Sequence, residues 1–357
     1  MLFEDKTQNN IIIDMKASIE PGTNIEEGTL IDHALRGAAA EFEQAYIELG
    51  MIDQNGYAET ADREHLLLRA KERGIEPLSP SYAIWKAEFN IDVELNQRFS
   101  SKELCYKCIE KMAPKTYRLM CEQIGTKGNI FQKELLPIEY IDGFEYGELT
   151  ELLVPARDEE ETETFRARYF SALTQTQATG GNRAQYKQIM REIEGVGACK
   201  IYRVTQQEKR IKIYFLNSLY KVPSDALVED VQEIMDPIGK QGEGEGKAAI
   251  FHIVDICPCL AAEIDIETNI TVDTGYTLED IIPTMESRID DYFLDLAKSW
   301  ENEDYVIVRI LRINTVIASV EGVVDIKDTK LNGNAENVLL DTNAIPVRGE
   351  LVWRQQS

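Results

Sequence analysis

The sequence has no apolar stretch of the roughly 20 residues that a helix needs to cross a bilayer. Its opening residues, MLFEDKTQNNIIIDMK, also lack the basic region and the long apolar segment of a signal peptide. We therefore expect a protein that is made and folds in the cytoplasm.

Positive charge is scarce. The 357 residues include 38 Lys and Arg against 63 Asp and Glu, so the formal net charge is −25. Contacts with nucleic-acid phosphates require clustered cationic side chains, and anionic membrane surfaces attract such clusters as well. The charge balance therefore argues against both nucleic acid and membranes as partners.

Cysteine and histidine are few, with six and three copies. Cys105 and Cys108 have the spacing of half a zinc site, but they lie in a strand-like run where such positions face opposite sides. The other close pair, Cys257 and Cys259, is distant in sequence. We expect reduced, mostly buried thiols and no bound metal.

Signatures of catalysis are also missing. No G-x-S-x-G or H-E-x-x-H motif accompanies the histidines. The glycine-rich segment 239–249 has Gln241 and Ala248 where a Walker loop needs Gly and Ser or Thr, and Glu243 and Glu245 would repel phosphate. The residues alone thus predict a non-enzymatic assembly or scaffold protein without a cofactor.

The sequence predicts a folded α+β protein of several domains. Hydrophobic residues make up 43% and charged residues 28%, as in soluble globular proteins, and the length suits two or three domains. We expect a helical, bundle-forming N-terminal segment (1–76), a β-rich domain (77–160) and two related α/β subdomains (161–260 and 261–357).

Residues 28 to 74 predict two helices. The first begins at Thr29, which forms a capping pattern with Asp32, and the second ends near Gly74. Apolar residues in the first helix recur at alternating spacings of four and three, which is a heptad repeat. These seven residues are Ile31, Leu35, Ala38, Phe42, Ala45, Leu49 and Ile52.

A heptad repeat favours packing along a straight partner helix, whereas an ordinary amphipathic helix carries a wider apolar stripe. Leu30, Ala34, Ala39 and Tyr46 would widen the stripe of this helix. From the residues alone, both interpretations remain open.

Helices and strands alternate after residue 160. The four carboxylates of Asp158 to Glu161 precede an apolar-periodic stretch, and negative charge there favours the start of a helix. Asn182, Ser224 and Thr277 are expected to cap three further helices, with strands between them.

A weak internal repeat relates two parts of the α/β region. An offset of 127 residues superposes the apolar pattern of residues 182–217 on that of 313–341. Both stretches predict a helix, a turn at a glycine (Gly195 or Gly322), a strand and a second strand. The alternative is that helix-to-strand turns simply favour glycine.

Several blocks of the chain resemble the baseplate J-like proteins, which build the baseplate wedges of contractile phage tails and of phage-tail-like bacteriocins. The likeness covers nearly the whole chain in the family's order. Its main blocks are the segment from EGTLIDHALRG to LLLRAKERGI (27–75), ELLPIEYIDGF (134–144), ATGGNRAQYKQIMREIEGVGACKIY (178–202) and VEGVVDIKDTKLNG (320–333).

The resemblance implies a wedge of two copies of this protein and one copy of a different wedge protein, with the N-terminal helices meeting in a bundle. The heptad from Ile31 to Ile52 fits such a bundle. Outer domains would link neighbouring wedges into a ring around the hub and spike and relay receptor engagement to the sheath. We thus expect a tail-particle baseplate protein, assembled in the bacterial host cytoplasm. Another oligomeric scaffold, or an unrecognised α/β enzyme, is the alternative.

Overall fold

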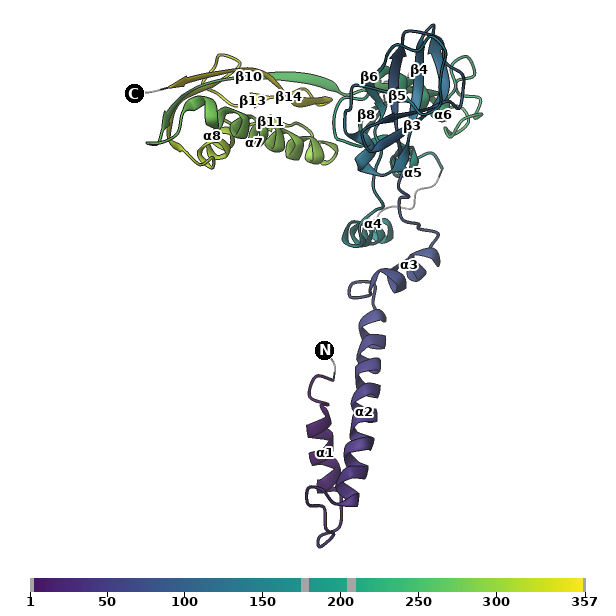
Figure 1. The fold of residues 1–357 in the computed structure, drawn as a ribbon, viewed down its shortest axis with the longest axis vertical. Helices are drawn as coiled ribbons and strands as arrows, with labels where there is room; N and C mark the ends of the chain where they lie inside the picture. The colour runs from purple at the N-terminus through teal and green to yellow at the C-terminus, as the bar shows by residue number, and fades with distance from the viewer. Residues whose placement is uncertain (1–2, 175–179, 204–209, 356–357) are drawn as a thin grey trace. The chain divides into compact units, whose positions relative to one another are not determined.

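The computed structural model describes residues 3–174, 180–203 and 210–355, and it forms two compact units. The first unit comprises the chain up to Leu78 together with Glu160–Thr174. The second comprises Ser79–Glu159 together with the chain after Thr174. The α+β class is confirmed, with a helical N-terminus followed by a β-rich domain (Figure 1).

The first unit is helical. Helices α1 (Gln8–Ala17) and α2 (Leu30–Asn55) form an antiparallel hairpin (Figure 1), and α3 (Arg63–Lys71) shares a small core with α4 (Thr162–Thr174). Residues from 161 onward are predicted to belong to the first α/β subdomain, whereas in the structure α4 groups with the N-terminal helices. The reason is that α4 buries Phe165 and Tyr169 against α3.

The second unit begins with a six-stranded antiparallel sheet in the order β5-β2-β3-β4-β1-β6. Residues Lys133 and Leu135, just before β5, exchange backbone hydrogen bonds with the start of β6, so the sheet closes on itself as a barrel. Aromatic side chains such as Phe89, Phe99 and Tyr117 fill its interior. The strands are β1 (Tyr82–Phe89), β2 (Arg98–Ser101), β3 (Leu104–Ala113), β4 (Thr116–Ile124), β5 (Leu136–Pro137) and β6 (Gly147–Val154).

The central α/β domain follows. In its sheet β8 pairs antiparallel with β7 and parallel with β9, while α5 and α6 share one core with the sheet. Asn182 and Ser224 cap the two helices through their side chains, as their positions in the sequence predict. The elements are α5 (Arg183–Glu192), β7 (Val196–Arg203), β8 (Arg210–Asn217), α6 (Asp225–Met235) and β9 (Ile253–Pro258).

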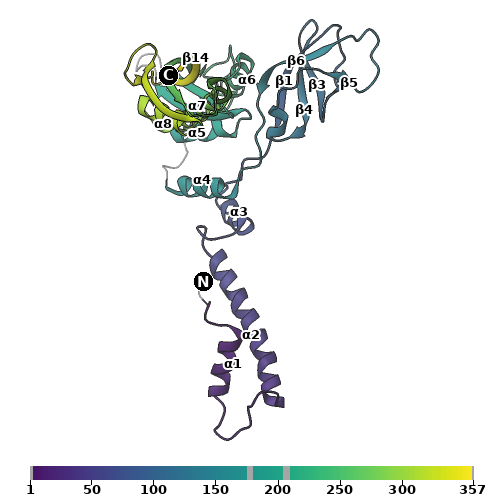
Figure 2. The same cartoon turned by 60° about the vertical axis from the view of Figure 1, so that its left-hand side comes forward.

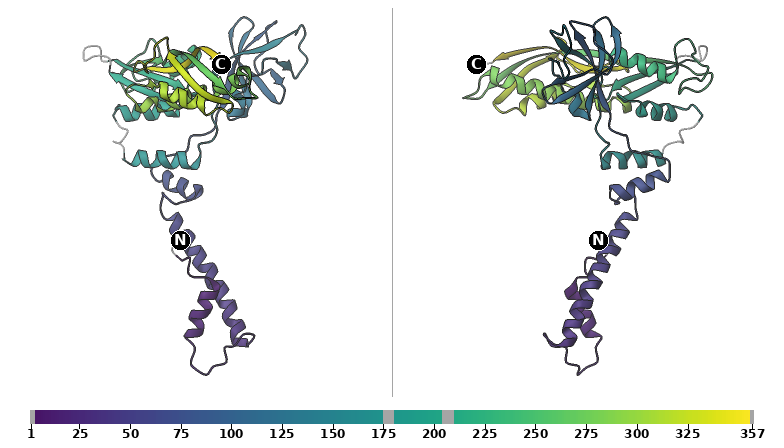
Figure 3. Two further views of the ribbon diagram at one scale, coloured as in Figure 1. Left: turned by 90° about the vertical axis from the view of Figure 1, so that its left-hand side faces the viewer. Right: turned by 45° about the vertical axis from the view of Figure 1, so that its right-hand side comes forward.

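The C-terminal domain has a three-stranded sheet in the order β12-β10-β14, with α7 and α8 on the same side of it (Figures 1 and 3). A short pair, β11 with β13, stands apart from that sheet. The elements are β10 (Leu260–Val272), α7 (Leu278–Ser299), β11 (Ile307–Val308), α8 (Ile310–Ala318), β12 (Val323–Leu331), β13 (Val338–Leu339) and β14 (Ala344–Gln355).

The predicted repeat is only partly right. Helix, glycine turn, strand and second strand recur in the predicted order, but the strand pairings differ. β7 pairs with β8, whereas β12 pairs with β10 and the two-residue β13 pairs with β11. The reason is that β10, which precedes α7, takes the central place that β8 holds in the other sheet. Each central strand has one antiparallel and one parallel neighbour. The two domains thus share a sheet pattern, with central strands from different points of the chain.

Candidate assembly surfaces

The heptad residues of α2 lie on an uncovered face of the helix. Leu35 is half-buried, and the other six are exposed, with 50% of Phe42 and 68% of Ile52 accessible to solvent. We call Ile31, Leu35, Ala38, Phe42, Ala45, Leu49 and Ile52 the α2 seam. Its exposure means that the first unit does not use these side chains for its own core.

Helix α1 covers a different face of α2. The α2 residues that meet α1 are Asp32, Arg36, Ala39, Glu43 and Tyr46, and each lies one position after a seam residue. One residue corresponds to a rotation of roughly 100° about the helix axis. Figure 2 shows that α1 runs beside only part of α2, so the last seam residues extend beyond it.

An ion cluster around the buried carboxylate of Asp32 holds α1 in this position. The Asp32 carboxylate accepts hydrogen bonds from Lys16 Nζ of α1 at 2.5 Å and from Arg36 Nε at 2.9 Å. These two cations hold the pKa of Asp32 well below its usual range. Ile11 and Ile12 bury their side chains against Ala39 beside the cluster. Together, these contacts fix which face of α2 remains open.

Both turn glycines have the left-handed conformation that their positions predict. The φ angles are +81° at Gly195 and +95° at Gly322. A Cβ on Gly195 would lie 2.8 Å from Cγ1 of Val154, and one on Gly322 would lie 2.8 Å from the Tyr276 ring. Both positions therefore need glycine for conformation and for space.

Cationic side chains join the domains of the second unit. Lys200 of β7 is buried, donates to the backbone carbonyls of Glu303 at 2.8 Å and Thr342 at 2.7 Å, and lies over the Trp300 ring. Burial lowers the pKa of Lys200. These contacts connect the central domain to the C-terminal domain.

Two further ion pairs act in the same way. Arg191 of α5 pairs with the buried carboxylate of Glu301 at 3.0 Å. Arg118 of β4 binds both carboxylate oxygens of Asp230 in α6, at 2.9 and 3.1 Å. The barrel, the central domain and the C-terminal domain are thus connected in series.

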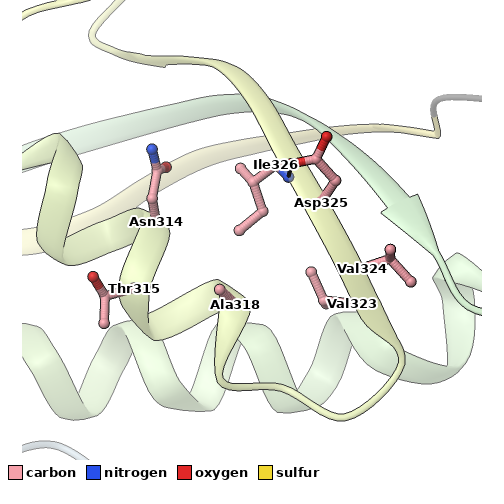
Figure 4. A pocket seen from close by; sticks show the side chains of 7 residues that line it. All are labelled: Asn314, Thr315, Ala318, Val323, Val324, Asp325 and Ile326. Carbon is pink, nitrogen blue, oxygen red and sulfur yellow. Dashed lines mark hydrogen bonds between the residues drawn. The ribbon is translucent and has the colours of Figure 1, made fainter.

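A shallow hollow of about 300 Å³ lies between α8 and β12 (Figure 4), and its lining is mostly aliphatic. Within residues 3–174, 180–203 and 210–355, no three His, Cys, Asp or Glu side chains are grouped to hold a metal ion. Cys105 is half-buried and Cys108 buried on opposite faces of β3, and both are free thiols.

None of the helices in the described part of the chain could span a membrane.

Two features of these surfaces were missed by sequence reasoning. Helix α1 has a signal in the Thr7 cap and in the helical spacing of Ile11, Ile12 and Met15. The signal for Lys200 is that it is the lone cation within the apolar stretch of a strand. Neither signal alone predicts which surface the side chain meets.

Comparisons with known proteins identify two family domains in the second half of the chain. A family model described as Baseplate J-like central domain matches residues 178–258, and one described as Baseplate J-like protein C-terminal domain matches residues 264–354. A cryo-EM structure of the anti-feeding prophage (AFP) baseplate contains a chain that aligns over 96% of this chain and 90% of its own length, with a TM-score of 0.40 and 8% identity.

Two relatives come from Bacillus subtilis (strain 168). Phage-like element PBSX protein XkdT is 30% identical over 360 residues, covering 100% of both chains. Uncharacterized protein YqbT is 32% identical over 354 residues, covering 98% of both. Full-length identity at this level, together with two family domains in consecutive order, shows that the chain belongs to the baseplate J-like family.

Proposed function

We propose that this chain is a structural, non-catalytic component of a baseplate wedge, in a contractile phage tail or a phage-tail-like particle. In this proposal the α2 seam packs in a helical bundle with a second copy of the chain and with a different wedge protein. The observation that carries the proposal is the uncovered heptad face of α2. Each α2 residue that meets α1 lies one position after a residue of this face.

The composition of the α2 seam suits such a bundle. Large residues such as Phe42 and Leu49 alternate with Ala38 and Ala45. The large side chains can act as knobs, and the alanines leave space for knobs of a facing helix. Full burial of a Leu, Ile or Phe side chain contributes about 1.5–3 kcal/mol. Burial of the large seam residues would thus offset much of the entropy that association costs.

The domains of the second unit would provide the outer contacts of the wedge. We propose that they meet neighbouring wedges, the hub and spike, and the sheath, and that they relay the trigger for sheath contraction. The series of joints at Arg118, Arg191 and Lys200 supports this role, since connected domains can move as a body. The protein would act in the baseplate after assembly in the bacterial host cytoplasm.

The test is co-expression with the neighbouring tail proteins, followed by native mass measurement. The wild-type chain should form a complex of two copies with one copy of a different protein. Leu35→Asp combined with Phe42→Asp should abolish it, because the bundle would bury unpaired carboxylates. The matched control is Ile47→Asp combined with Met51→Asp, which changes exposed α2 residues outside the seam and should leave assembly intact.

Two outcomes would count against the proposal. If the Leu35→Asp and Phe42→Asp variant co-purifies with its partner at wild-type yield, the α2 seam is not the interface. If the wild-type chain forms only closed oligomers of itself, it is a scaffold of another kind.

A further inference from the structure

A second exposed apolar surface lies on the barrel, far along the chain from the α2 seam. It consists of Leu136, Ile138, Tyr140 and Tyr146, which we call the β5 strip. Tyr140 is 89% exposed and Leu136 is 63% exposed, while their neighbour Leu135 is buried in the barrel core. The core therefore does not use the four strip residues.

Hydrogen bonds hold the backbone of the β5 strip on both sides. Leu135 N donates to the carbonyl of Gly147 in β6, and Ile138 N donates to the carbonyl of Arg98 in β2. The side chain of Asn90 pins the following turn, since its Nδ2 donates to the carbonyl of Gly143 and its Oδ1 accepts from Tyr146 N. The apolar side chains thus project from a preorganised backbone, which lowers the entropy lost on binding.

The strip lies in an acidic segment. Between residues 134 and 156 there are six carboxylates and no Lys or Arg. Glu148 pairs with Lys133 and Glu139 interacts electrostatically with Arg98, but among the described residues no cation forms an ion pair with Asp142 or Glu145, which lie beside the strip. A complementary surface therefore needs positive charge around an apolar centre.

We infer that the β5 strip is a docking surface for a different protein, one that presents an apolar patch bordered by Lys and Arg. The inference rests on the proposed role in a baseplate, and it adds a second interface to that of the α2 seam. A second copy of this chain fits poorly, since its own net charge is −25. Anionic lipid surfaces and nucleic acids are disfavoured by the same carboxylates.

The experiment uses the full chain co-expressed with the neighbouring tail proteins, with Tyr140→p-benzoylphenylalanine as a photo-crosslinking probe. Irradiation should link residue 140 to one different protein, at a site with Lys or Arg within the crosslinked peptide. Leu136→Ser combined with Ile138→Ser should lower the crosslink yield about tenfold or more, because the apolar centre is lost. The matched control is Leu95→Ser, which changes a 56% exposed residue of the same barrel and should leave the yield unchanged.

Charge is tested separately. Glu139→Lys combined with Glu145→Lys should also lower the yield, and rising salt should weaken the wild-type crosslink. A crosslink to a second copy of this chain would overturn the inference, and so would no crosslink at all. Native mass measurement distinguishes a failure of this inference from a failure of the wedge proposal. If the wild-type complex forms without a crosslink, only the inference that the β5 strip is a docking surface is wrong. If no complex forms, the wedge proposal fails as well.

Discussion

Single glycines determine how two helices of the second unit pass into strands. We predict that Gly195→Val and Gly322→Val each destabilise the domain concerned by about 1 kcal/mol or more, because valine is strained at positive φ. The contacts of 2.8 Å that a Cβ would make at either site add to this cost. The measurement is the thermal midpoint of each variant.

Gly50→Ala is the matched control for the glycine variants. Gly50 lies within α2, and a Cβ there would meet nothing within 4 Å. Alanine should therefore leave stability unchanged or raise it slightly, since glycine is a poor helix former. A loss at Gly50 as large as at Gly195 would mean that conformation is not the cause.

Asp92 makes the barrel sensitive to acid. Its carboxylate accepts from Lys111 Nζ at 2.8 Å, Lys115 N at 3.0 Å and the Tyr117 hydroxyl at 3.0 Å, and these bonds lower the pKa of Asp92 to about 2. Since the folded pKa lies below the unfolded value of about 3.9, Asp92 stabilises the barrel above about pH 4. That contribution is lost as the pH falls towards about 2.

We predict that Asp92→Asn lowers the thermal midpoint of the barrel near neutral pH and has a smaller effect in acid. The reason is that wild-type Asp92 is itself partly protonated near pH 2. The difference between the two midpoints, followed as the pH is lowered, measures the effect. An equal difference at every pH would exclude the charge of Asp92 as its source.

At the scale of whole elements, α1 depends on one buried charge for its place. We predict that Asp32→Asn loosens α1, because Lys16 and Arg36 lose their shared partner. Hydrogen exchange of the amides in residues 8–17 should become faster, while exchange in the second unit stays unchanged. The control is Asp14→Asn, which removes only an exposed pair with Lys6 at 3.6 Å.

Helix boundaries could be predicted from the sequence because their causes are local. Three helices begin at a capping residue, which is Thr29, Asn182 or Ser224. In each case the side-chain oxygen accepts a hydrogen bond from the backbone amide three residues later. The alternating runs of the barrel are equally local, and their inward side chains form its core.

Pairings between distant segments could not be predicted in this way. The sequence pattern of β13 resembles that of β8, yet β13 pairs with β11 and has only two residues. The run from Asp158 to Glu161 does precede a helix, but Glu160 also accepts from Leu78 N and pairs with Arg168 at 2.7 Å. These partners lie far apart in sequence or depend on tertiary packing, so no local pattern specifies them.

For the candidate surfaces, the residues of the α2 seam could be predicted from the sequence, but their exposure to solvent could not. Periodicity shows which side chains share a face, whereas α1 decides which face remains free. Leu136, Ile138 and Tyr140 of the β5 strip do alternate with period two, but alternation does not tell which face is exposed, because that follows from the closure of the barrel.

At the scale of the molecule, Lys200 makes buried contacts that connect the central domain to the C-terminal domain. We predict that Lys200→Met destabilises the attachment of the C-terminal domain by about 2 kcal/mol, because two hydrogen bonds from a charged donor disappear. Limited proteolysis should cut faster between residues 258 and 264. Lys133→Met, at an exposed surface pair, should leave the cleavage rate unchanged.

If the α2 seam is an interface, the offset between the two faces of α2 would also limit how many partners the helix can bind. A helix with apolar residues on every side could recruit neighbours without end, and such contacts build open fibres. Here α1 occupies one sector of α2, so in the proposed bundle each copy would present the α2 seam and not the face that α1 covers. By occupying that sector, α1 would limit the number of partners that α2 can bind, and the proposed bundle would stop growing once every seam is covered.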